Sequence, residues 1–379
     1  MKNQKKHHRP AWVEINLGRL ENNFVLINAD RPRHLKFLTV VKDQAYGHGA
    51  IEISQAALRA GASYLGVVTL DEALQLRQNK IQAPILIFGE RSQDEIATSI
   101  SNSLTCCIND KMIALSAIET ARKLKKNLTI HIEIDTGMSR YGIRWDEAAE
   151  FITFIAQIPE FNFEGIFTHF AMSDETDKSY AMLQLERFNT LLSEIRKKDI
   201  SVQLLHASNT GGFLDLPMAN FDMVRMGILP LGVYPSKVCR RIPGLLPVMS
   251  VKSKIAAIRD LKIGDKVGYG MRYTAETPRR IAVLPLGYGD GYPRVRNRGE
   301  VLVHGKRAPI IGGNAMDAMM VDITHIPESR QWDEVVIMGN QGEEEISVHE
   351  IAELKGSVSY DILTGWRSRL PRIYVRGID

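Results

Sequence analysis

The sequence has little cysteine, little net charge and no long apolar run. Its 379 residues include three cysteines, and two of them, Cys106 and Cys107, are adjacent. This number and spacing exclude a disulfide framework and a zinc ribbon. The net charge is +4, with basic and acidic residues interspersed, which gives no indication of binding to nucleic acid or to a membrane surface. No stretch approaches the length of a membrane span.

The basic start of the chain, residues 1–10, lacks the apolar run and the small-residue cleavage site of a signal peptide. Together with the low cysteine content, this favours a protein of the reducing cytoplasm. The apolar content of 44% and the charged content of 24% are typical of a globular protein. A chain of 379 residues is too long for one ordinary domain but has the length of a barrel with an appended domain.

From Leu38 to about Pro230, short apolar runs alternate with amphipathic helical patterns. The runs are residues 38–41, 64–68, 84–88, 104–108, 129–134, 164–168, 201–205 and 223–229. Roughly eight strand–helix units of about 25 residues each are what a (β/α)₈ barrel requires. An open, doubly wound sheet is the alternative, but the even repetition favours closure. The sequence therefore predicts an α/β fold that begins with a barrel of the TIM type.

The pattern changes after residues 231–236. From about Met249 onward, short alternating β-branched runs are separated by glycine and proline, and long helical patterns are scarce. Such a pattern predicts a mostly β second domain. We expect the barrel to cover residues 11–238 and the β domain to cover residues 239–379.

In a barrel, functional groups lie at the carboxyl ends of the strands, and phosphate often binds after strands seven and eight. The first expected strand ends at Lys42, an amine that is costly to bury unless it is paired, lowered in pKa or covalently used. The other expected strand ends contribute residues 135–140, 168–170, 206–210 and 225–228. This set of an amine, two histidines, two arginines and small or hydroxyl residues suits pyridoxal 5′-phosphate held by a lysine Schiff base. A barrel that binds a sugar phosphate would explain most of the same residues.

Each feature also has a purely structural interpretation. Lys42 could extend from its strand end into solvent, and Arg225 could be a buried ion-pair partner of Asp222. The run Gly287–Gly291 imitates part of a dinucleotide fingerprint, but it does not open a βαβ unit, so a tight turn is the better interpretation.

Motifs along nearly the whole chain resemble the alanine racemase family, pyridoxal-phosphate enzymes with an N-terminal barrel and a C-terminal β domain. In order, the matching segments are residues 41–42, 45–49, 135–140, 168–171, 206, 209–210, 222–228, 267–270, 287–294, 316–317 and 360–363. The resemblance implies a homodimer that interconverts L- and D-alanine in active sites shared between its subunits.

The resemblance also implies roles for individual residues. Lys42 would hold the cofactor and move the α-proton on one face of the substrate, and Tyr269 of the second subunit would do so on the other face. His169 would hydrogen-bond to Tyr269, and Arg225 would contact the pyridine nitrogen, which stays unprotonated because arginine keeps its proton. The remaining cofactor-binding residues would be Tyr46, Asn209, Thr210, Gly227, Ile228 and Tyr360, and the substrate carboxylate would be held by Arg140 and Met316.

The chain also departs from the family pattern. Many members have a carbamylated lysine where this chain has Glu133, and our hypothesis is that Glu133 contacts Arg140 directly as its anionic partner. Asp43 beside the lysine and the small Ala315 near the substrate leave open a serine or broad-specificity racemase.

Two further alternatives concern the type of protein. A decarboxylase of basic amino acids would have an acidic residue at the pyridine nitrogen, whereas this chain has Arg225. A non-catalytic cofactor-binding barrel would lack the β domain and therefore any counterpart of Tyr269.

Overall fold

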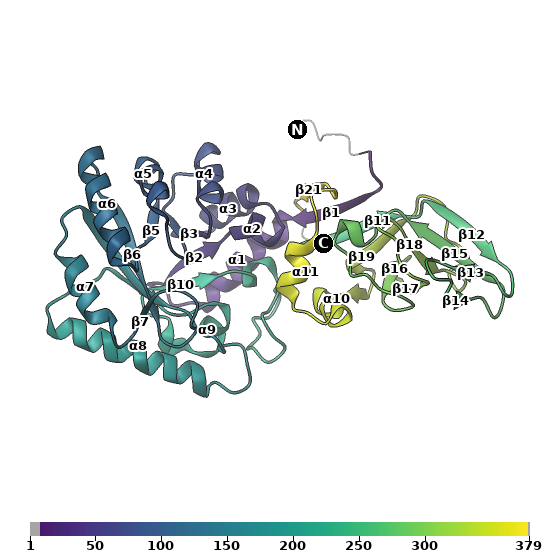
Figure 1. The fold of residues 1–379 in the computed structure, drawn as a ribbon. Coiled ribbons are helices and arrows are strands. Elements are labelled where there is room, and N and C mark those ends of the chain that lie inside the picture. Colours follow the sequence, from purple (N-terminus) through teal and green to yellow (C-terminus); the bar gives the residue numbers. More distant parts are fainter. Residues whose placement is uncertain (1–7, 378–379) are drawn as a thin grey trace. The chain divides into compact units, whose positions relative to one another are not determined.

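The computed structural model describes residues 8–377, so residues 1–7, which make up most of the basic start considered above, lie outside the described part. The chain divides into two compact units. The barrel unit comprises residues 20–45 and 50–245, and the β unit comprises the described residues 8–19, 46–49 and 246–377 (Figure 1). Among the described residues, no helix has the length and apolar character needed to cross a membrane.

The barrel unit is built on eight parallel strands that form a nearly closed ring. In their order around the ring they are β10 (Met223–Met226), β2 (Lys36–Val40), β3 (Tyr64–Val67), β4 (Ile85–Ile87), β5 (Thr105–Cys107), β6 (Leu128–Asp135), β8 (Phe161–Thr168) and β9 (Leu204–His206). Backbone hydrogen bonds from Asp222 N to Leu205 O (3.0 Å) and from Arg225 N to Ser208 O (2.9 Å) join the last strand to the one before it. The predicted barrel is therefore confirmed.

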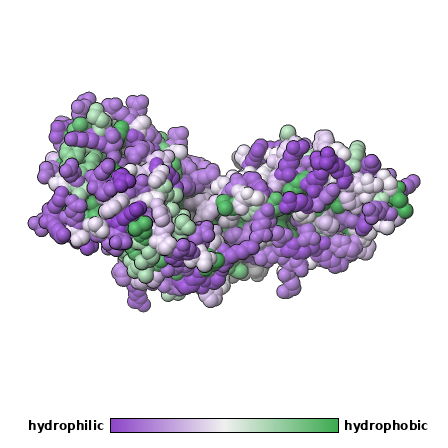
Figure 2. Space-filling view, turned by 60° about the horizontal axis from the view of Figure 1, so that its bottom comes forward, coloured by the Kyte–Doolittle hydropathy of each residue, from purple (hydrophilic) through white to green (hydrophobic). Residues whose placement is uncertain are grey.

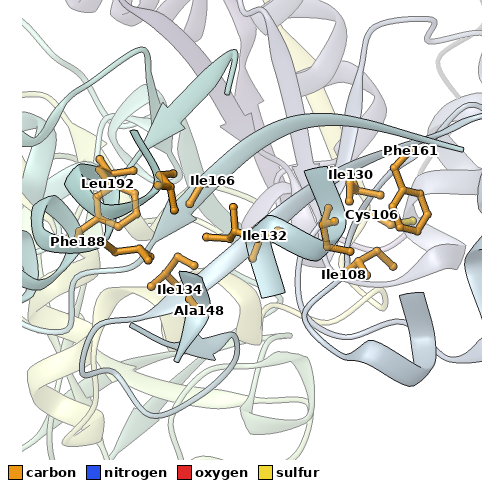
Figure 3. Packing of buried hydrophobic residues seen from close by; sticks show 14 of the residues in the cluster. Cys106, Ile108, Ile130, Ile132, Ile134, Ala148, Phe161, Ile166, Phe188 and Leu192 are labelled. Carbon is orange, nitrogen blue, oxygen red and sulfur yellow. The ribbon is translucent and has the colours of Figure 1, made fainter. Parts of the chain in front are cut away.

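Helices surround the strands because each presents one apolar face to them. They are α1 (Leu17–Asp30), α3 (Ala50–Arg59), α4 (Leu70–Gln78), α5 (Gln93–Ser101), α6 (Lys111–Leu124), α7 (Ala148–Ala156), α8 (Ser179–Lys197) and the short α9 (Thr210–Asp215). Figure 3 shows Ile132 and Ile134 of β6 in one buried cluster with Phe188 of α8. On the face drawn in Figure 2, hydrophilic residues predominate and apolar ones are scattered.

The inward-facing side of the barrel strands carries a smaller apolar cluster, which includes Leu38, Tyr64, Leu86, Cys107 and Phe167. Inside and outside faces alternate along each strand because successive side chains point in opposite directions. Since the interior is filled by side chains, the functional groups lie at the strand ends and among the few polar residues between the strands.

The β unit is mostly β-structure, as predicted. Its main sheet has the order β12 (Ala257–Leu261), β15 (Arg279–Leu284), β18 (Met319–Asp322), β17 (Lys306–Ile311), β16 (Glu300–Val303), β19 (Glu334–Gln341), β11 (Met249–Lys254), β1 (Ala11–Asn16) and β21 (Arg372–Val375). Smaller elements are the hairpin β13 (Lys266–Val267) and β14 (Tyr273–Thr274), the strand β20 (Glu344–Ile346), and the helices α10 (Val348–Lys355) and α11 (Ser359–Gly365).

The described residues before α1, which include strand β1, belong to this second unit. Strand β1 pairs antiparallel with β11, with Val13 opposite Val251, and parallel with β21, with Val13 opposite Arg372. The structural division therefore differs from the expected one, which assigned residue 11 onward to the barrel and changed domain at residue 238 rather than 245. The alternation in β1 indicates a half-buried strand, but it carries no information about a partner strand more than 200 residues away.

Candidate active site

Lys42 lies two residues beyond the end of strand β2 and begins a short left-handed turn, α2 (Lys42–Tyr46). Asp43, Gln44 and Ala45 have φ values of 50°, 55° and 51°, a conformation that costs L-residues about 1–2 kcal/mol each. Two contacts from helix α4 hold the turn: Asp43 N donates to Glu72 Oε1 (2.6 Å), and Gln44 Nε2 donates to Gln75 Oε1 (3.0 Å). The amine of Lys42 is therefore presented by a strained turn that α4 clamps.

Lys42 is half-buried, and its charge is opposed by its surroundings. Burial lowers the pKa of its amine, and the positive charge of Arg140 lowers it further, while Glu72 and Asp43 partly offset both effects. A lowered pKa increases the fraction of neutral amine near pH 7, and the neutral amine is the form that acts as a nucleophile or base.

Arg225, on β10, is buried and donates hydrogen bonds to the neighbouring strand ends. Its Nη2 donates to the carbonyl oxygens of Thr168 (2.7 Å) and Ala207 (2.8 Å), and its Nη1 donates to that of His206 (3.1 Å). Burial lowers the pKa of Arg225 to about 10, so the guanidinium stays charged at neutral pH. Among the described residues, the ion pairs within 4.0 Å do not include one between Asp222 and Arg225; Asp222 Oδ2 instead accepts from Leu205 N (2.8 Å) at the barrel closure.

His169 lies beside Arg225 at the end of β8. Its Nδ1 is 3.3 Å from Arg225 Nη2. Burial, followed by the charges of Arg225, Arg140 and Lys42, holds the pKa of His169 well below its usual range. The ring is therefore neutral at physiological pH, and it can accept a hydrogen bond through one nitrogen and donate one through the other.

The loops after β9 and β10 contain the expected phosphate-binding residues. Thr210 begins α9, and Asn209 caps this helix with its Oδ1, which accepts from Gly212 N (3.0 Å) and from Ser173 Oγ (2.7 Å). Gly227 and Ile228 directly follow β10. These are the strand ends at which barrels commonly bind phosphate.

Four expected site residues belong to the β unit. The aromatic rings of Tyr46 and Tyr360 lie with their centroids 6.0 Å apart. Tyr269 lies in the β13–β14 loop and is 70% exposed, and Met316 is 55% exposed. The tips of these two side chains therefore have little cover from their own unit.

The backbone around Met316 is fixed by the glycine-rich run that follows β15. Residues 288–290 form a 3₁₀ turn, in agreement with the structural interpretation, and Gly289 N donates to Met316 O (2.7 Å). A Cβ on Gly287 would lie 2.2 Å from Ala315 O, so only glycine fits there. Buried Asp290 completes the turn by accepting from Gly287 N (3.0 Å) and binding Arg9 with both carboxylate oxygens.

Glu133 does not form the expected ion pair with Arg140. Among the described residues, the ion pairs within 4.0 Å do not include one between these two side chains; Arg140 is exposed, with its guanidinium 6.0 Å from the ring of Tyr141. Glu133 lies on β6 and is 5% exposed, whereas Arg140 lies beyond the turn that follows β6. The two interact only at longer range: burial raises the pKa of Glu133 to about 7, although the charges of Arg225 and Arg140 oppose the rise.

Replacing Glu133 by glutamine is expected to change how stability depends on pH. The folded protein holds the proton of Glu133 more tightly than the unfolded chain does, so the contribution of Glu133 to the free energy of unfolding falls as pH rises from about 4.5 to about 7. Glutamine does not titrate, so from pH 5 to pH 8 the variant should gain up to about 3 kcal/mol relative to the wild type.

Urea unfolding at the two pH values measures this difference. Glu150→Gln, at an exposed position on α7, is the control and should show the same difference from wild type at both. An equal stability difference for Glu133→Gln at pH 5 and pH 8 would show that Glu133 titrates normally.

Sequence reasoning missed several polar residues that support the site. They are Glu72, which clamps the Lys42 turn, and His131 and Glu164, which lie inside the barrel. For His131 and Glu164, the available signal was a charged or titratable residue in the middle of an apolar strand, because such a residue needs a partner when it is buried.

Comparisons with known proteins agree with this geometry. A family model described as alanine racemase, N-terminal domain, matches residues 15–235, and one described as alanine racemase, C-terminal domain, matches residues 248–374. The alanine racemase of Carboxydothermus hydrogenoformans is 40% identical over 97% of this chain and 100% of its own length, and that of Methanococcus maripaludis is 37% identical over 97% and 99%.

Solved structures are similar over nearly the whole chain. An alanine racemase from Clostridium difficile has a TM-score of 0.94 at 32% identity and covers 99% of this chain and 98% of its own. The alanine racemase from Bacillus anthracis, determined with bound L-Ala-P, has a TM-score of 0.92 at 35% identity and covers 99% and 97%.

Proposed function

Because this chain belongs to the alanine racemase family, it is an amino-acid racemase, and we propose that it interconverts L- and D-alanine with pyridoxal 5′-phosphate as its cofactor. The observation that carries the proposal is the presence in one barrel of an amine with a lowered pKa, Lys42, and a buried cationic donor, Arg225. The three cysteines of the chain, Cys106, Cys107 and Cys239, are buried free thiols, which supports the expected cytoplasmic location.

The donors of the barrel fit this cofactor. A neutral amine suits its aldehyde, the guanidinium of Arg225 suits a ring nitrogen that accepts a hydrogen bond, and the Thr210 hydroxyl suits its phosphate. The backbone amides of Gly227 and Ile228 would add phosphate donors, and Asn209 positions the start of α9. When bound, the cofactor draws electrons from the α-carbon of an amino acid and so makes the α-proton easier to remove.

Two residues would move the α-proton, one on each face of the substrate. Lys42 is suited to this task because its lowered pKa leaves more neutral amine near pH 7. Tyr269 would serve the opposite face. Free phenols have a pKa of about 10, so a tyrosine base needs a hydrogen-bonding neighbour, and neutral His169 would supply that bond. With one base on each face, one group would remove the α-proton and keep it, while the protonated group on the opposite face would donate its own proton, which inverts the α-carbon.

Arg225 would keep the ring nitrogen of the cofactor unprotonated. A guanidinium only donates hydrogen bonds, and Arg225 keeps its charge because its lowered pKa is still about 10. The weaker electron withdrawal by such a ring would favour return of the α-proton over transamination. An acidic residue, as a decarboxylase of basic amino acids would have, does not occupy this position.

The remaining residues would bind the charged ends of cofactor and substrate. Tyr46 and Tyr360, whose rings are neighbours in the β unit, would provide further phosphate contacts. The substrate carboxylate would be held by the exposed guanidinium of Arg140 and by the backbone amide of Met316. Exposure of Tyr269 and Met316 within the β unit supports a homodimer in which the partner's barrel receives them.

Side-by-side incubation of L-alanine and L-serine in deuterated water tests the function. The expected result is loss of optical rotation and incorporation of α-deuterium with L-alanine. If neither substrate exchanges its α-proton, the racemase assignment is wrong. Faster exchange of L-serine would overturn alanine as the substrate, which is the outcome that the small Ala315 left open.

Replacing Glu72 by alanine is expected to weaken both stability and cofactor retention. Glu72 Oε2 accepts from the backbone N of Val68 and Thr69, and Glu72 Oε1 accepts from Asp43 N. Loss of the capping box should lower the free energy of unfolding by about 1–2 kcal/mol, and the freed turn should loosen Lys42.

Glu95→Ala is the control, since Glu95 Oε2 accepts from Ser92 N at the start of α5 as Glu72 Oε2 does from Thr69 N on α4, and Glu95 also pairs with Arg91 (3.0 Å). Urea unfolding should show similar losses for both variants, but only Glu72→Ala should release cofactor faster during dialysis. Equal cofactor retention in the two variants would contradict the proposed clamp.

A further inference from the structure

A line of polar side chains crosses the interior of the barrel from the carboxyl ends of its strands towards their amino ends. Arg225 Nη1 lies 2.9 Å from His206 Nδ1, and the other nitrogen of His206, Nε2, lies 3.0 Å from His131 Nδ1. His131 Nε2 in turn lies 3.1 Å from Glu164 Oε2, which also accepts a hydrogen bond from the Tyr64 hydroxyl. The line thus connects the proposed site to a carboxylate near the opposite end of the barrel.

The chemistry of the two terminal groups gives this line one direction. Arg225 can only donate, so Nδ1 of His206 must accept and its Nε2 must carry the proton. That proton is donated to Nδ1 of His131, so the Nε2 proton of His131 is donated to Glu164. An ionised carboxylate only accepts, and it therefore fixes the far end of the line as Arg225 fixes the near end.

The charges in the line favour this state. Burial lowers the pKa of His131. Burial and the charge of Arg225 hold the pKa of His206 well below its usual range. Both rings are therefore neutral. Burial alone would raise the pKa of Glu164, but hydrogen bonds from His131 and Tyr64 outweigh it and lower the pKa. The line therefore has a cation at one end, an anion at the other and two neutral imidazoles between them.

The local backbone provides the space that the line needs. Ile130 of β6 pairs with Phe163 of β8, but His131 pairs with Gly165, so Glu164 is the additional residue of a β-bulge. A bulge redirects a side chain, and here it accompanies an inward-facing glutamate. A Cβ on Gly165 would lie 2.5 Å from two atoms of the His131 ring, so the imidazole fits only beside glycine.

We propose that Glu164, assisted by Tyr64, is a positioning residue for Arg225. The carboxylate sets the tautomers of His131 and His206, and these present a lone pair to Arg225 that fixes the orientation of its guanidinium. Phe167 supports the arrangement, since its ring stacks on His206 with centroids 4.8 Å apart and lies 5.2 Å from the Arg225 guanidinium carbon. The inference rests on the proposed role of Arg225 at the ring nitrogen of the cofactor.

Two variants of similar size at position 164 test the proposal. Glu164→Met removes the acceptor, whereas Glu164→Gln keeps an acceptor oxygen for His131. The imidazole tautomers are read by NMR of protein labelled with ¹⁵N in histidine, with signals assigned from His131→Gln and His206→Gln. The wild type should show both rings protonated at Nε2. Glu164→Met should show a mixture of tautomers, and Glu164→Gln should restore the wild-type pattern.

The same variants should separate kcat from KM. Glu164→Met is expected to lower kcat for alanine about tenfold while KM stays within about twofold, because Arg225 orientation affects proton transfer and not carboxylate binding. Glu164→Gln should stay within about twofold of wild type in both constants. Glu160→Met is the control; Glu160 precedes β8 and pairs with Arg122 outside the barrel interior, so its loss should change neither the tautomers nor kcat.

Two results would overturn the proposal: wild-type tautomers and kcat in Glu164→Met, or a Glu164→Gln variant as impaired as Glu164→Met. If Glu164→Met does not yield folded protein, Tyr64→Phe takes its place, since it removes one donor to Glu164 and keeps the buried ring. It should lower kcat in the same direction by a smaller factor, and a wild-type kcat would then count against the proposal. A wild type without α-proton exchange would refute the proposed function instead, and the tautomer measurement would still decide on Glu164.

Discussion

Replacing Lys42 by alanine is expected to abolish the colour of the bound cofactor and to lower alanine racemisation by at least about 10³-fold. The variant loses the group that would bind the cofactor covalently and, at the same time, the base on one face of the substrate. Fold stability should change little or increase, because the half-buried amine carries a desolvation cost that has already lowered its pKa. Absorbance of the purified protein and polarimetry with L-alanine measure the two effects.

Lys42→Arg separates charge from covalent chemistry. It keeps a cation at the same place but cannot form a Schiff base, so it should be as colourless and as inactive as Lys42→Ala. Lys123→Ala, at an exposed position on α6, is the control and should remain coloured and active. Retained colour and activity in Lys42→Ala would show that another amine binds the cofactor.

The barrel could be predicted from the sequence because each of its strand–helix units has a pattern that can be recognised within a short stretch of residues. Each strand from Leu38 to Met226 is a short apolar run beside an amphipathic helix, and consecutive parallel strands of a barrel are neighbours in space. Strand β1 could not be assigned in the same way, since its partners β11 and β21 are far away in the sequence. Its alternating pattern fits an edge or an interior position of any sheet with one buried face.

The proposed site shows the same limit. Residues at strand ends, such as Lys42 and Arg225, could be chosen because a barrel brings those ends together. The distance between Glu133 and Arg140 could not be judged from their spacing in the sequence, because Arg140 lies in an exposed loop beyond the turn that follows β6. His131 and Glu164 meet through a bulge in β8, and a bulge shifts the alternation from which inward-facing residues are inferred.

Electrostatics connects these observations. Lys42, Arg140 and Arg225 place three basic groups in or near the mouth of the barrel, and the two histidines nearest to Arg225, His169 and His206, are kept neutral. An anionic cofactor and a carboxylate substrate would relieve this accumulation of positive charge, so their binding should be weakened by salt. The acidic groups offset only part of this charge: Asp43 and Glu72 act on Lys42, Glu164 accepts hydrogen bonds inside the barrel, and Glu133 has a pKa raised to about 7 by burial.

Replacing Tyr269 by phenylalanine is expected to lower racemisation by about 10²- to 10⁴-fold and to affect the two enantiomers differently. The variant keeps Lys42, so the enantiomer whose α-proton faces the lysine should still exchange that proton with deuterated water, without inversion. The other enantiomer should lose both exchange and inversion. Tyr273→Phe, in the same hairpin, is the matched control and should exchange and racemise both enantiomers like the wild type. Exchange of both enantiomers by Tyr269→Phe would mean that the second base is another group.

Mixing this variant with Lys42→Ala tests whether the active sites are shared between subunits. Each variant alone lacks one base in every site. A mixed dimer has two sites. If each site combines Lys42 of one subunit with Tyr269 of the other, one site has both residues and the other site has neither. Random pairing of equal amounts should therefore recover about one quarter of the wild-type activity per subunit. Sites built within single subunits could not be restored by mixing, so an inactive mixture of stable dimers would show that Lys42 and Tyr269 act from the same chain.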